Sequence, residues 1–183
     1  MITIYLYFLY IVLLIFKNNV FGKDIEIKYK DNFLNIVDII KNNQNAGELN
    51  LKFTDNYYKF TELAMSDVFS IIITPQTNIT LVGNNDGTVF DFDYDRRGTF
   101  KISNSDNKGY IVKFENITFE NFCFKSFISG AYLIYIESNT MNFYTQFKNC
   151  IFRNNNLWLF NIAIKYNKND YNNPSLYFNN CKF

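Results

Sequence analysis

Three aspartates alternate with aromatic residues in the segment TVFDFDYD. Residues two apart on a β-strand point to the same face, about 7 Å apart, so the pattern predicts one row of carboxylates from Asp91, Asp93 and Asp95. Such a row could bind Ca²⁺ or act as a paired general acid and base. The alternative is a solvated outer face whose charge is balanced by Arg96 and Arg97. The row is the one acidic cluster in the sequence that suggests catalysis.

The composition excludes several other functional classes. The chain has no histidine, which removes Ser-His and Cys-His nucleophiles and histidine metal sites. No CxxC spacing occurs, so a zinc site is not expected. The formal net charge is +1 and the charges are spread along the chain, so we expect no nucleic-acid partner. With 48% hydrophobic residues, the chain has enough apolar material for one folded domain.

The N-terminus predicts export from the cell. Residues 1–16 form one apolar run, and Val20 and Gly22 suit the −3 and −1 positions of a signal peptidase site. We therefore expect a signal peptide over residues 1–22, a secreted or cell-surface product and no membrane span after cleavage. An uncleaved anchor is the alternative, although the run is shorter than the roughly 20 residues that span a bilayer.

Two Asn-x-Thr sequons agree with secretion, and they begin at Asn78 and Asn116. Glycosylation at these positions would make the product a glycoprotein.

The residues after the predicted signal peptide divide into two parts. Residues 23–48 contain a short alternating strand and, over residues 31–43, apolar residues at helical spacing. From residue 49 to residue 183 the pattern has period two, with short runs rich in Phe, Tyr and Ile between Asn, Gly, Asp and Ser. No second long helical pattern appears in the sequence. The chain is therefore expected to be all-β, either a sandwich or barrel of hairpins or a solenoid of parallel coils.

A repeated hexapeptide favours the solenoid. Phe114–Phe119, Phe147–Phe152 and Phe178–Phe183 share the frame Phe-x-Asn-[Ile/Cys]-x-Phe, spaced 33 and then 31 residues apart. A coil that stacks on itself must return the same side chain to the same place each turn, whereas a hairpin sandwich has no reason to keep this spacing. We expect the aromatic residues to point inward and the Asn to lie at a bend.

The same alignment places other residues above one another. Asn116, Asn149 and Asn180 predict a ladder of left-handed residues with amide hydrogen bonds between coils. Cys150 and Cys181 share one slot, so their Cα atoms should lie about 5 Å apart, within disulfide range. The alternative is a stacked pair of buried thiols, because Ile117 fills the same slot one coil earlier. Trp158 lies in another alternating run and is expected in the core.

The chain resembles the right-handed parallel β-helix proteins of the pectin-lyase-like superfamily. The resemblance rests on a helical segment before Gly47, a strand from Glu48 to Leu51 and an aromatic turn from Tyr57 to Phe60, followed by a second coil at Ile79–Asn84 and Gly87–Phe90. It implies that the short N-terminal helix caps the first coil and protects its open edge. No catalytic constellation of the family is matched.

We therefore expect a secreted or cell-surface β-helix with a binding, adhesive or structural role, and a polysaccharide or cell-surface ligand as its partner. The alternative is a polysaccharide lyase or glycoside hydrolase of the β-helix type. No cofactor is expected, apart from Ca²⁺ at the aspartate row if that row binds it. Because Phe183 ends the chain in the middle of a coil, we also expect the sequence to be a fragment of a longer stack.

Overall fold

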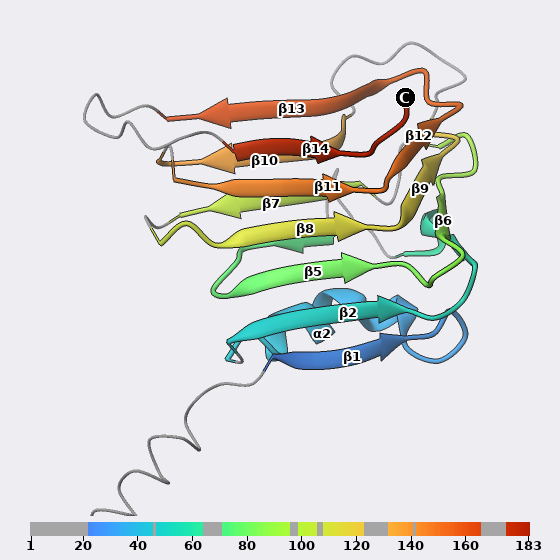
Figure 1. Cartoon of the computed structure of the whole chain (residues 1–183), viewed down its shortest axis with the longest axis horizontal. Coiled ribbons are helices and arrows are strands. Elements are labelled where there is room, and N and C mark those ends of the chain that lie inside the picture. Colours follow the sequence, from blue (N-terminus) through green and yellow to red (C-terminus); the bar gives the residue numbers. More distant parts are fainter. Residues whose placement is uncertain are drawn as a thin grey trace, which may run out of the picture.

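A computed structural model describes residues 22–45, 47–63, 71–95, 99–105, 108–122, 132–140, 142–165 and 175–183. Over these residues the chain forms three parallel sheets that stack as a β-solenoid (Figure 1). The expected all-β parallel β-helix is therefore confirmed. The predicted signal peptide lies almost entirely outside the described residues.

The three sheets take their strands in turn from each coil. Sheet A has the order β1 (Lys23–Ile27), β2 (Glu48–Phe53), β5 (Asn78–Val82), β8 (Ile111–Glu115), β11 (Tyr144–Lys148) and β14 (Ser175–Asn179). Sheet B contains β3 (Tyr57–Lys59), β6 (Thr88–Asp91), β9 (Ile117–Glu120) and β12 (Ile151–Arg153). Sheet C contains β4 (Ile71–Ile73), β7 (Phe100–Asn104), β10 (Tyr132–Ser138) and β13 (Trp158–Ile164).

The coil is right-handed. In Figure 1 the strands of sheet A run from left to right across the front, those of sheet C return behind them, and the chain rises from blue to red. This is the hand that twisted strands favour when a connection joins parallel neighbours. Each neighbouring pair of strands within a sheet is parallel, so equivalent residues of successive coils lie next to one another.

Columns of phenylalanine fill the interior. Phe114, Phe147 and Phe178 pair in register, and their rings stack with centroids 5.0 and 5.1 Å apart. Phe119 and Phe152 form a second stacked pair at 5.0 Å with nearly parallel planes. Stacked and edge-to-face aromatic contacts add to the free energy gained by burial. The repeat therefore specifies the core, as its spacing predicts.

The N-terminal helix forms within the predicted residues 31–43, with a 3₁₀ turn at its start. It begins as the 3₁₀ turn η1 (Phe33–Asn35) and continues as α2 (Ile36–Asn42). The ring of Phe33 packs on Tyr58 at 5.1 Å and on Phe60 at 5.2 Å, so this segment covers the core of the first coil. Leu34 belongs to the expected apolar stripe but is 60% exposed. Each residue advances about 100–120° around the axis of an α-helix or 3₁₀ helix, so Leu34 lies away from the face on which Phe33 is buried.

The bend between sheets A and B is made by asparagine. Asn116, Asn149 and Asn180 have φ values of 57°, 53° and 51°, in the left-handed region that Asn tolerates better than most residues. Asn149 Nδ2 donates to Asn116 Oδ1 at 3.1 Å, and Asn180 Nδ2 donates to Asn149 Oδ1 at 2.8 Å. These hydrogen bonds join three successive coils along the axis.

Glycine replaces asparagine at the equivalent bend one coil earlier. Gly83 donates its N–H to the carbonyl oxygen of Glu115 at 2.8 Å. A Cβ atom at this position would lie 2.2 Å from the carbonyl oxygen of Asn116. The close approach of the two coils therefore requires a residue without a side chain, and the asparagine ladder begins one coil later.

The ladder predicts a specific order of stabilities. Asn149→Ala removes two amide hydrogen bonds, each worth about 1 kcal/mol, and keeps a Cβ at positive φ, so we expect unfolding to become easier by about 2–3 kcal/mol. Asn149→Gly loses the same hydrogen bonds but adopts positive φ freely, so it should be more stable than Asn149→Ala by about 1 kcal/mol. Urea denaturation measures both differences.

The matched control for this comparison is Asn35→Ala. Asn35 is exposed and has a φ of −99°, so its replacement should change the free energy of unfolding by less than about 0.5 kcal/mol. Equal stabilities for wild type and both Asn149 variants would show that the ladder contributes nothing.

Candidate functional site

The aspartate row does not form as the sequence pattern predicts. Strand β6 ends at Asp91, and the next residues turn, with φ values of 47° at Asp93 and 57° at Tyr94. Asp91 is buried, Asp93 is exposed and Asp95 is partly exposed. The three carboxylates therefore do not share one face of a strand, because left-handed residues interrupt the alternation on which that expectation depends. Arg96 and Arg97 lie outside the described residues.

Asp91 accepts three hydrogen bonds. The donors are the hydroxyl group of Tyr57, the backbone N–H of Asp93 at 2.8 Å and Nδ2 of Asn121 at 2.9 Å. Burial alone raises the pKa of the Asp91 carboxyl, but these hydrogen bonds outweigh it and hold the pKa below its usual value. Burial and the neighbouring carboxylate also raise the pKa of Tyr57, which remains a donor. The Asp91 carboxylate therefore stabilises the turn that follows β6.

The other members of the row are separate from Asp91. Asp93 forms an ion pair with Lys59, with Oδ2 and Nζ 2.8 Å apart. In the part of the chain that the structure describes, no group of three or more Cys, Asp and Glu side chains is placed to hold a metal ion. The acid and base chemistry considered for this row therefore has no assembled site among the described residues.

A second asparagine column was missed by the sequence analysis. Asn121 and Asn154 have φ values of 60° and 55° and follow β9 and β12 directly. Asn121 reaches across to Asp91. The signal was present, because the hexapeptide continues as Phe-x-Asn in both coils, FEN and FRN. Extending the aligned repeat by two residues would have predicted this second bend.

The two aligned cysteines are free thiols in the structure. Cys150 is buried and its thiol donates to the carbonyl oxygen of Phe114 at 3.5 Å, while the Cys181 thiol donates to that of Phe147 at 3.4 Å. Burial raises the pKa of the Cys150 thiol to about 12. In this arrangement Cys150 packs as a small buried residue and Cys181 is partly buried. A disulfide between them stays a prediction.

The two sequon asparagines already have hydrogen-bond partners. Asn78 Oδ1 accepts the backbone N–H of Ile111 at 2.9 Å, and Asn116 belongs to the ladder. Glycosylation of either residue stays a prediction.

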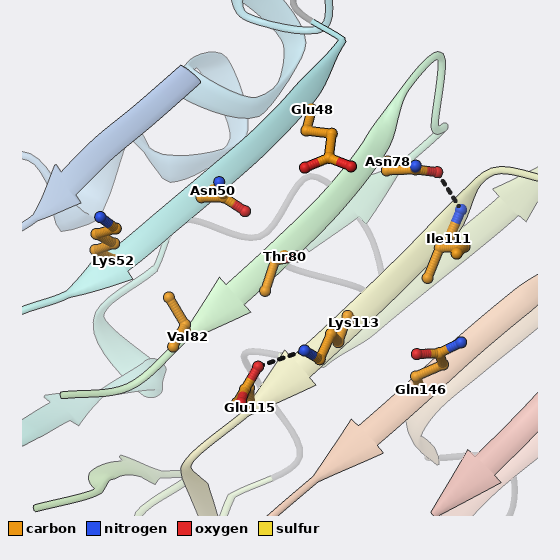
Figure 2. A pocket seen from close by; sticks show the side chains of 10 residues that line it. All are labelled: Glu48, Asn50, Lys52, Asn78, Thr80, Val82, Ile111, Lys113, Glu115 and Gln146. Atoms are coloured by element: carbon orange, nitrogen blue, oxygen red, sulfur yellow. Dashed lines mark hydrogen bonds and ion pairs between the residues drawn. The ribbon is translucent and has the colours of Figure 1, made fainter. Parts of the chain in front are cut away.

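A groove of about 460 Å³ runs across the outer face of sheet A. Figure 2 shows the side chains that line it, which come from four neighbouring strands, β2, β5, β8 and β11. The lining consists of Glu48, Asn50, Lys52, Asn78, Thr80, Val82, Ile111, Lys113, Glu115 and Gln146. Most of these side chains are polar, so the groove offers many donors and acceptors on an open surface.

The lining residues form rows along the axis of the solenoid. Asn50 pairs with Thr80, Thr80 pairs with Lys113, and Lys113 pairs with Gln146. A second row joins Lys52, Val82 and Glu115 in the same way. Neighbouring strands lie about 4.8 Å apart, so a ligand placed along the axis meets a new member of each row at every coil.

Three of the four charged side chains in the lining form ion pairs with other described residues. Glu115 forms ion pairs with Lys113 and with Lys148, the latter at 2.7 Å, and Lys52 is paired with Asp24. Burial raises the pKa of the Glu115 carboxyl, but the two ammonium groups outweigh it and hold the pKa below its usual value. The lining contributes two carboxylates and two ammonium groups, so it has no net charge.

Trp158 is not in the core, contrary to the sequence-based prediction. Its side chain is 62% exposed, and Phe160, two residues later, packs against the core instead. Trp158 pairs with Tyr132 of β10, which is itself partly exposed, and among the described strands β13 has a neighbour on one side only. An alternating pattern does not reveal this position within the sheet.

Comparison with protein-family models, curated proteins and solved structures gave no match to this chain. Within the described residues, no helix is both long enough and apolar enough to cross a membrane.

The Asp91 hydrogen bonds predict a dependence of stability on pH. Because the folded-state pKa of Asp91 is lowered, its contribution is present above pH 3.8, the usual pKa of an aspartate, and is lost as the pH falls below this value. Asp91→Asn places a donor group against the Tyr57 hydroxyl and should destabilise the protein by about 2 kcal/mol at neutral pH. The loss should shrink as the pH approaches 3. Thermal unfolding between pH 3 and 7 measures it.

Asp93→Asn is the matched control, since it changes an exposed, ion-paired carboxylate and leaves the backbone N–H that binds Asp91. It should cost less than about 1 kcal/mol. A larger loss for Asp93→Asn than for Asp91→Asn would contradict the role assigned to Asp91.

Proposed function

We propose that the protein is a secreted or cell-surface binding protein, which holds a linear polysaccharide in the groove of sheet A without cleaving it. The observation that carries the proposal is the set of in-register polar rows along the groove. A polymer with a regular repeat can make the same kind of contact at each coil, whereas a small compact ligand would use only part of the rows.

The chemistry of the lining favours an uncharged polymer. Two carboxylates and two ammonium groups cancel, so a polyanion such as a polyuronate would gain no net attraction. Amide groups of Asn50, Asn78 and Gln146 and the hydroxyl group of Thr80 can donate and accept hydrogen bonds, as sugar hydroxyl groups require. A neutral glycan of a cell wall or cell surface fits this lining.

Binding without cleavage is favoured over the alternative lyase or hydrolase. Both types of enzyme need a carboxylate or another base that is able to exchange a proton near neutral pH. Asp91 is occupied by three hydrogen-bond donors and Glu115 by two lysines. Neither carboxylate has the raised pKa that suits a general acid.

We further propose that the coil belongs to the pectin-lyase-like superfamily and that residues 1–22 direct it to the cell exterior. Support for the first part comes from the right-handed parallel coils and the asparagine bends between sheets A and B. Support for the second comes from the apolar N-terminal run and the two sequons.

The groove is tested by the double variant Asn50→Ala and Gln146→Ala, which removes the amides at both ends of the first row. We expect at least about a tenfold rise in the Kd for a neutral glycan, equivalent to two hydrogen bonds of modest strength. A glycan array identifies the ligand, and calorimetry measures the affinity. Binding should depend weakly on salt, since the groove has no net charge.

Ser103→Ala is the control, because Ser103 lies on β7 in another sheet and is not among the residues that line the groove. Unchanged affinity in the groove variant would place the ligand elsewhere. New reducing ends or unsaturated products from an incubated polysaccharide would instead support the enzyme.

A further inference from the structure

Trp158 is the one tryptophan of the chain. It is largely exposed, and its ring contacts a second aromatic ring on the neighbouring strand β10. It pairs in register with Tyr132 of β10, and the two rings stack with centroids 5.5 Å apart and planes 17° apart. Tyr132 in turn lies 6.3 Å from Tyr135, with planes 27° apart. We call these three residues the aromatic strip.

The core does not need the aromatic strip. The pair Ile134 and Phe160 occupies the next register position of the same two strands, and both side chains pack with the interior. Trp158 is 62% exposed, while Tyr132 and Tyr135 are partly exposed. Exposed aromatic residues that gather in one place mark binding surfaces more often than scattered ones do.

The charges beside the aromatic strip identify the kind of ligand. Lys101 Nζ lies 5.7 Å from the centre of the Tyr135 ring and 3.1 Å from Glu137 Oε2. This ion pair leaves no net charge next to the strip. A ligand that matches these features has a flat apolar face for the rings and neutral polar groups at its edge for Lys101 and Glu137.

We propose that the aromatic strip is a second sugar-binding site, at which a neutral pyranose ring stacks on Trp158. A pyranose with equatorial hydroxyl groups presents C–H groups on its faces and hydroxyl groups around its rim, which are the two features that the strip and its ion pair complement. The inference rests on the proposed function for the polysaccharide nature of the ligand. It concerns sheet C, a different surface from the groove on sheet A.

Intrinsic fluorescence tests the proposal directly, because all tryptophan emission comes from the aromatic strip. The probes are neutral oligosaccharides of glucose, mannose and xylose. We expect a saturable blue shift of the emission and protection of Trp158 from acrylamide quenching. Tyr132→Ala should raise the apparent Kd of this response at least about tenfold, since it removes the ring that holds Trp158 in place.

Two variants separate this site from the groove. The groove variant, with Asn50→Ala and Gln146→Ala, should keep the fluorescence response. Leu34→Ala, which removes an exposed apolar side chain from η1, away from both surfaces, should keep both responses. Thermal unfolding of each variant checks that it is folded. Absence of any saturable response, a response lost only in the groove variant, or a stronger response to an aromatic peptide than to any sugar would overturn the proposal.

Discussion

The structure depends on one constraint: each coil must place the same kinds of side chain at the same positions around the coil as the coil before it. Parallel pairing within three sheets supplies the register, and stacked rings and asparagine amides use it. A free energy gained once per coil is gained again at each repetition. The same register holds on the outer surface, where side chains that point outward also form rows along the axis. The groove on sheet A is the outward counterpart of the phenylalanine columns.

The repeat made the fold predictable. Phe114, Phe147 and Phe178 are far apart in the sequence, but their constant frame indicates that they lie above one another, and the left-handed asparagine bend follows from the same alignment. Local alternation was less informative. It did not show that β6 ends at Asp91, because a turn with left-handed residues is compatible with the same letters. It also did not show that Trp158 is exposed. An alternating pattern separates the two faces of a strand, but it does not show which strands pack beside that strand in the sheet.

The groove could not have been predicted from the sequence in the same way. Its residues come from four strands, and no motif connects Asn50 with Gln146. Only the register of β2, β5, β8 and β11 brings them together. The side chains that define it are also ordinary surface residues by type, so composition gives no signal. A binding surface of a solenoid is therefore a property of the stacking, whereas a catalytic site with its own motif can be recognised in a single segment.

The side-chain amide dipoles of the asparagine ladder are aligned along the solenoid axis. Asn180 donates to Asn149 and Asn149 donates to Asn116, so the side-chain amide dipoles all point the same way along the axis. Aligned dipoles polarise one another, and their effect accumulates toward the two ends of the column, as it does for peptide groups in a helix. The two ends of the ladder therefore present opposite ends of the aligned amide dipoles, although the residue is asparagine at both ends.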